Sequence, residues 1–193
     1  MCKYSDEIQS MYFGSSRRQI SLHTGVIYKD SDTVVSFCTA SDNLKHGPAA
    51  KWAHMDRVLK HITQSNNYKT IHFISDGPTT QYRNKTNIFL WNSRITKYGV
   101  KFSTWNTLRH DMGNGRRVVF VGRSKRAADQ QVLLKKRDIT CAKDFVELLT
   151  ATDTTIKVFI VTGKAIADIE ATLPAVLKPV PNMMKIHQVC FTG

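Results

Sequence analysis

Apolar and polar side chains alternate along residues 19–28, with the apolar ones mostly at every second position. This pattern is typical of a half-buried strand. A polar turn over 29–32 follows, and residues 33–39 form a second run rich in β-branched residues. We therefore expect a β-hairpin. Over residues 49–62, large apolar side chains recur at steps of three and four, which predicts a helix.

A short apolar run, K-T-I-H-F-I-S over residues 69–75, predicts a buried strand that ends at Asp76-Gly77-Pro78. The same periodicities predict further elements beyond it: a helix over 85–97, a strand over 101–105, a β-like run over 118–121, helices over 123–136 and 142–149, a strand over 156–161 and a helix over 164–173. From Pro174 onward we expect an irregular tail. Antiparallel strands followed by this alternation predict an α/β domain with a mixed sheet flanked by helices.

The net charge of +13 changes the picture, because it is concentrated in one stretch. Residues 82–137 hold fourteen of the Lys and Arg residues and only two acids. Such an excess is typical of a protein that binds a polyanion, and its segregation favours a phosphate-binding face over an ordinary solvated surface. We expect nucleic acid, DNA above all, to be contacted by basic residues of this stretch: Arg83, Lys85, Arg116, Arg117, Arg123, Lys125 and Arg126.

Aromatic residues lie within and beside the basic stretch. Tyr82 and Tyr98 are expected to contact bases, whereas Trp91 and Trp105 are expected in the core.

Cysteine usage and hydropathy indicate the compartment. The four cysteines are scattered and form no C-x-x-C pair, so neither a disulfide framework nor a zinc site is expected. No apolar run is long enough to span a bilayer, and the first residues contain no signal-peptide core. We expect a nuclear or cytoplasmic protein with no membrane partner.

Asp76 is the residue that most strongly suggests chemistry. A buried strand that ends in Ser-Asp-Gly places a carboxylate at the carboxyl edge of a sheet, where α/β proteins build their sites. The alternative is an Asp-Gly turn, which is common. Asp42 also follows a predicted strand and could approach Asp76, although a capping role before the helix at 49–62 is the alternative.

Both the element order and several local motifs resemble a known group. The order of hairpin, helix, strand with a terminal Asp, helix and strand is the ribonuclease H order with its first strand removed. The matching segments are Y-S-D-E-I-Q-S (4–10), I-S-L-H-T-G-V (20–26), S-D-N-L-K-H (41–46), I-S-D-G-P-T-T-Q-Y-R-N-K (74–85), K-R-A-A-D (125–129) and K-I-H-Q (185–188). Together they resemble the RNase H-like, DDE-type transposase-derived proteins of animals.

The resemblance implies that Asp76 matches the second metal-binding acid, which would hold Mg²⁺ or Mn²⁺ in an active relative. It places the first acid on a strand before Met1. Relatives carry H-G-K-G-x-x-D-G before the lysine-arginine pair. In this chain Met112 takes the place of the histidine and Val118 that of the acid. A displaced substitute, His110-Asp111, is the alternative.

Because one carboxylate cannot hold two magnesium ions, we expect an inactive enzyme that needs no cofactor. The expected organisation is an incomplete RNase H-like core over 1–137 and a small αβα extension over 138–193. Because the first strand is missing, the hairpin that starts at 19–28, or its neighbour, is expected to have an unpaired edge. Two alternatives stay open. One is a metal-dependent transposase or nuclease fragment whose first acid lies upstream of Met1, and the other is a vestigial or protein-interaction domain.

Overall fold

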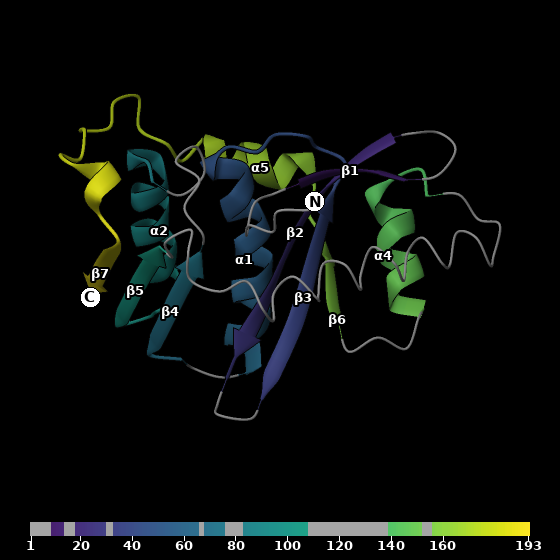
Figure 1. The fold of residues 1–193 in the computed structure, drawn as a ribbon, viewed down its shortest axis with the longest axis horizontal. Helices are drawn as coiled ribbons and strands as arrows, with labels where there is room; N and C mark the ends of the chain where they lie inside the picture. The colour runs from purple at the N-terminus through teal and green to yellow at the C-terminus, as the bar shows by residue number, and fades with distance from the viewer. Residues whose placement is uncertain are drawn as a thin grey trace. The chain divides into compact units, whose positions relative to one another are not determined.

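The computed structural model describes residues 9–13, 18–29, 33–65, 68–75, 83–107, 139–151 and 156–193. Figure 1 shows a mixed α/β fold in which these residues form two sheets and four α-helices. The chain divides into two compact units. Unit 1 comprises residues 1–45 and 113–163, and unit 2 comprises residues 46–112 and 164–193.

The sheet of unit 1 has the order β1-β2-β3-β6. Its strands are β1 (Gln9–Phe13), β2 (Arg18–Tyr28), β3 (Val34–Ser41) and β6 (Ile156–Ile160). The first three are antiparallel neighbours, and β6 pairs with β3 in parallel. The predicted hairpin and the strand at 156–161 are therefore confirmed. The unpaired edge expected for the hairpin or its neighbour does not fall on the hairpin. β1, which the sequence pattern did not predict, covers β2, and β6 covers β3, so that β1 and β6 are the edge strands among the described residues.

Helix α4 (Ala142–Ala151) closes the core of unit 1, and it confirms the helix predicted at 142–149. It packs on β3 and β6. Alternate residues of the hairpin strands, such as Ile20 and Cys38, are fully buried in one cluster with Phe145 and Leu149 of the helix. Phe145 and Leu149 are four positions apart and so lie on one face of α4, which is the face that packs on the sheet.

The sheet of unit 2 has the order β4-β5-β7. Strands β4 (Thr70–Ser75) and β5 (Phe102–Thr107) are parallel, and β7 (Gln188–Thr192) is antiparallel to β5. The strands predicted at 69–75 and 101–105 are confirmed. The irregular tail expected from Pro174 onward is wrong at its end, because Gln188–Thr192 alternates exposed and half-buried side chains and pairs along β5.

Two helices complete the core of unit 2: α1 (Pro48–Ser65) and α2 (Lys85–Lys97). Both were predicted from periodicity, and α2 has the predicted bounds. The ring of Trp105 stacks on that of Phe73 at a centroid distance of 5.0 Å and contacts Trp91 edge-on at 6.1 Å. Trp91 and Trp105 are 2% and 6% exposed. Their predicted place in the core is confirmed.

Residues 138–193 contribute strands to both sheets, so the grouping of the described residues differs from the expected division at 137/138. Pairing between distant segments is the reason. Helix α5 (Gly163–Glu170) confirms the helix predicted at 164–173. It begins at the last residue of unit 1, and the rest of the helix belongs to unit 2. The β-like run at 118–121 and the helix at 123–136 lie outside the described residues. None of the described helices is long and apolar enough to cross a membrane.

Candidate functional site

The parallel strands β4 and β5 end together. Ser75, the last residue of β4, pairs in register with Thr107, the last residue of β5. The predicted end of this strand is therefore confirmed, and Asp76 follows it directly in the sequence. The prediction that the strand is buried is wrong, because only Phe73 and Ser75 are buried and Ile74 is 47% exposed. Asp76 itself lies outside the described residues, so its place at this edge stays a prediction. The carboxyl edge of a parallel pair is where α/β folds commonly build a site.

Helix α2 begins next to this edge. Asn84 caps it, because its Oδ1 accepts a hydrogen bond of 2.8 Å from the backbone N–H of Asn87. The other N–H groups of the first turn have no partner within the helix, so this end is favourable for anions. Arg83 and Lys85 flank the cap. The remaining predicted nucleic-acid contacts lie outside the described residues: Arg116, Arg117, Arg123, Lys125 and Arg126.

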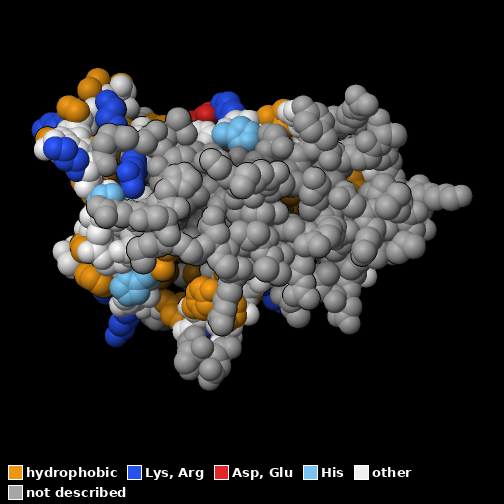
Figure 2. Space-filling model, viewed as in Figure 1, with side chains coloured by type: hydrophobic (Ala, Val, Ile, Leu, Met, Phe, Trp, Pro, Cys, Tyr) orange, Lys and Arg blue, Asp and Glu red, His pale blue; other side chains and the backbone are white. Residues whose placement is uncertain are grey.

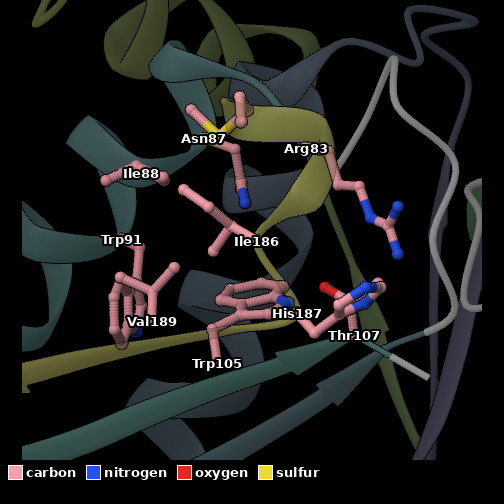
Figure 3. A pocket seen from close by; sticks show the side chains of 10 residues that line it. Arg83, Asn87, Ile88, Trp91, Trp105, Thr107, Ile186, His187 and Val189 are labelled. Carbon is pink, nitrogen blue, oxygen red and sulfur yellow. The ribbon is translucent and has the colours of Figure 1, made fainter. Parts of the chain in front are cut away.

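A hollow of about 330 Å³, part of it open to solvent, lies between α2, β5 and the start of β7 (Figure 3). Ten residues line it, and none of them is acidic: Arg83, Asn87, Ile88, Trp91, Trp105, Thr107, Met183, Ile186, His187 and Val189. Figure 3 shows Arg83, Thr107 and His187 gathered at one end and Ile88, Trp91 and Val189 at the other. The hollow is therefore polar and basic at one end and apolar at the other.

Lys51, in α1, places a buried positive charge behind the same edge. Its side chain is 1% exposed, and its Nζ donates to Asn87 Oδ1 at 3.2 Å and lies 3.6 Å from the ring centre of Trp105. Trp105 Nε1 in turn donates to Ser75 Oγ at 2.9 Å. A buried ammonium needs such partners, because burial removes its hydration.

The orientation of Asn87 follows from this network. Its Oδ1 also accepts a hydrogen bond of 2.8 Å from Trp52 Nε1, so two donors fix the oxygen toward α1. Figure 3 shows the amide nitrogen of Asn87 turned to the hollow. The sequence analysis did not identify Lys51. The sequence did contain a signal for its burial. Lys51 lies seven positions before the buried Val58 and eleven before the buried Ile62, which places it on the same face of the helix.

Comparison with known proteins identifies a family. A family profile described as "Domain of unknown function (DUF8701)" matches residues 1–193. The chain belongs to the DUF8701 family. No curated protein and no solved structure matches the chain. Because the family description names no activity, the function of this DUF8701 chain is inferred from its residues.

Asp42, the second predicted site residue, is a helix cap in the DUF8701 chain. Its exposed side chain accepts a hydrogen bond of 2.7 Å through Oδ1 from the backbone N–H of Ala142, at the start of α4. Capping was the alternative for this residue, but the helix is α4 and not the one that begins at Pro48. The predicted approach of Asp42 to Asp76 is untested, because Asp76 lies outside the described residues.

The described part of the DUF8701 chain offers no metal centre. Within it, no three His, Cys, Asp or Glu side chains gather in a way that could hold a metal ion. One oxygen of Asp42 is engaged by the α4 backbone. The described residues thus do not provide the carboxylate set that Mg²⁺ or Mn²⁺ would need, and we derive no reaction step through such an ion.

An ion-pair cluster on α1 and α2 engages part of the basic stretch. Asp56 Oδ2 lies 3.3 Å from Arg94 Nη1 and 4.0 Å from Lys97 Nζ. The Tyr98 hydroxyl donates to the backbone oxygen of Asp56 at 3.1 Å. Burial raises the pKa of Asp56 above its ordinary value, although the charges of Arg94 and Lys97 oppose the rise. Tyr98, which we expected to contact bases, is thus held against α1, while Tyr82 lies outside the described residues.

The surface agrees with the composition. On the face drawn in Figure 2, the coloured residues show more Lys and Arg side chains than Asp and Glu. Lys85, one of the predicted contacts, is exposed at the start of α2, where its Nζ donates to the backbone oxygen of Leu177 at 2.9 Å. An exposed ammonium of this kind can exchange its carbonyl partner for a phosphate.

Proposed function

We propose that this chain is a nucleic-acid-binding domain, derived from an RNase H-like DDE transposase, that has lost strand cleavage. The observation that carries the proposal is the carboxyl edge of β4 and β5. There strand β4 ends directly before Asp76 in the sequence, and the basic start of α2 adjoins the hollow. DNA is the partner that best fits a net charge of +13.

The order of the elements supports the RNase H-like part of the proposal. Within unit 2, helix α1, strand β4, helix α2 and strand β5 follow one another, and the two strands are parallel neighbours. Such a unit places successive strand ends at one edge of a sheet. The hairpin of β2 and β3 precedes it in the chain, as the resemblance implies.

Two features of the described residues support the loss of cleavage. DDE-type chemistry uses paired metal ions held by several carboxylates, and the described acid Asp42 serves as a helix cap. In addition, Lys51 holds a buried ammonium behind the edge, in contact with Trp105 and Asn87. If Asp76 lies at this edge as predicted, a fixed positive charge there would weaken the binding of a divalent cation by Coulomb repulsion.

Salt dependence tests the proposal. We expect the full chain to bind a short labelled DNA duplex at low salt, with log Kd rising linearly and steeply with log salt concentration as counterions are released. Flat salt dependence, or no binding at low salt, would reject nucleic-acid binding and favour a vestigial or protein-interaction domain.

Cleavage of plasmid or branched DNA with Mn²⁺ tests the loss of activity. We expect no cleavage by the wild-type chain. Cleavage that Asp76→Asn abolishes, while the surface control Asp168→Asn retains it, would instead identify a metal-dependent nuclease or transposase fragment. Asp168 is a suitable control because its exposed carboxylate pairs with Lys164 on the surface of α5.

A further inference from the structure

The polar end of the hollow is built from three separate segments of unit 2. Arg83 precedes α2, Thr107 ends β5, and His187 precedes β7. The backbone N–H of Thr107 donates to the His187 oxygen at 2.8 Å, which holds the ends of the two strands side by side. Figure 3 shows the three side chains gathered at this end. The sheet and the helix therefore bring a guanidinium, a hydroxyl and an imidazole together.

The electrostatics of this end favour an anion. None of the described residues that line the hollow is acidic, and the start of α2 adds the partial positive charge of N–H groups that have no partner within the helix. The apolar side chains at the other end, Ile88 and Val189 among them, exclude water from one side. A contact between an anion and Arg83 is stronger beside such a wall than in open solvent.

Trp91 belongs to the apolar end of the hollow, opposite the three polar side chains. It is 2% exposed, and its Nε1 has no hydrogen-bond partner among the described residues. A buried N–H without an acceptor is costly, by about 1–3 kcal/mol.

We propose that this hollow is a phosphate-binding subsite in which Arg83, Thr107 and His187 are the donors. A phosphate group fits because it is anionic, rich in acceptor oxygens and small enough for a shallow hollow. The inference rests on the proposed function, since it names the group of the nucleic acid that unit 2 contacts. A backbone phosphate and free inorganic phosphate share this chemistry, and the experiment separates them.

The experiment titrates the full chain with inorganic phosphate and, separately, with a labelled single-stranded oligonucleotide at low salt. Arg83→Gln removes the guanidinium charge and His187→Gln removes the imidazole. Thr107→Val removes a hydroxyl while keeping the shape of the strand residue. Lys178→Gln is the matched control, because it removes one exposed cation of unit 2 that does not line the hollow. Circular dichroism melts check that each variant is folded.

We expect each hollow variant to weaken the binding of phosphate and of the oligonucleotide by roughly five-fold or more, and Lys178→Gln by less than about two-fold. Arg83→Gln should also lower the slope of log Kd against log salt by about one. If the folded hollow variants bind both ligands as tightly as Lys178→Gln does, the proposed subsite is overturned, while nucleic-acid binding by the chain is not.

The remaining outcomes are also distinct. If the variants weaken phosphate binding but not oligonucleotide binding, the hollow holds small free anions and its role with nucleic acid is overturned. If the wild-type chain binds phosphate but no oligonucleotide, the proposed function is overturned. The hollow is then not a contact for nucleic acid either. If it binds the oligonucleotide but no phosphate, only the subsite fails.

Discussion

The buried imidazole of His54 makes the stability of the chain depend on pH in a predictable way. His54 lies on α1 and is 0% exposed. Burial, and to a lesser extent the nearby charge of His46, lowers the pKa of His54 from 6.5 to about 4. The folded chain therefore keeps this imidazole neutral at a pH where the unfolded chain has already protonated it.

The sign follows from proton binding. Between pH 6.5 and about 4 the unfolded state binds more protons at His54 than the folded state does, so the free energy of unfolding falls as the pH falls through this window. At about 1.4 kcal/mol for each pH unit, the full loss is roughly 3 kcal/mol. At pH ~5, roughly 2 kcal/mol of this is already lost relative to neutral pH.

Urea unfolding measures this contribution when the wild-type chain and His54→Gln are compared at neutral pH and at pH ~5. Carboxylates also titrate in acid, but they do so in both chains, so the difference between the two chains reports His54 alone. We expect the wild-type chain to lose about 2 kcal/mol more than His54→Gln between the two conditions. His61→Gln, which removes a less buried imidazole from the same helix, is the control and should behave as the wild type does. Equal losses in the wild-type chain and in His54→Gln would refute the reasoning.

Three further substitutions test the packing by urea unfolding at neutral pH. Asn87→Leu removes the acceptor shared by Lys51 and Trp52 and should cost roughly 3–5 kcal/mol, whereas Asn92→Leu, on the exposed face of α2, should change stability by less than about 0.5 kcal/mol. A small effect at Asn87 would mean that the buried ammonium does not depend on it. Asp42→Ala removes the cap of α4 and should cost about 1 kcal/mol, and Asp42→Asn, which keeps an acceptor, should cost less; equal costs would argue against capping. Phe145→Ala opens a cavity in the core of unit 1 and should cost roughly 3–5 kcal/mol, so a cost near zero would contradict its burial.

Local pattern predicted most of the described elements because each carries its own hydrophobic period. The hairpin of β2 and β3 alternates in twos, and α1 and α2 repeat every three to four residues. The strands β1 and β7 were missed for the opposite reason. Each is only five residues long, which is too short to show a clear hydrophobic period, and its assignment as a strand depends on its pairing with β2 or β5. A short strand of this kind is defined by its neighbour more than by its own sequence.

The partners of Asp42 and Lys51 were beyond sequence reasoning for a similar reason. Asp42 caps a helix one hundred positions away, and no local rule connects it with Ala142. Lys51 looks like an ordinary solvated residue between Ala50 and Trp52, yet the face of α1 on which it falls is buried. A helical projection would have placed it among apolar residues, but it could not have named Asn87 as the acceptor.

The cations of the basic stretch look alike in the sequence but have different surroundings in the fold. In the sequence, Arg83, Arg94 and Lys97 count equally toward a phosphate-binding face. In the fold, Arg94 and Lys97 flank the partly buried Asp56, while Arg83 lines a hollow whose described lining residues include no acid. The number of phosphates that the chain contacts should therefore be smaller than its count of cations suggests. The measured salt slope reports that number directly, and Arg94→Gln should lower stability while leaving the slope nearly unchanged.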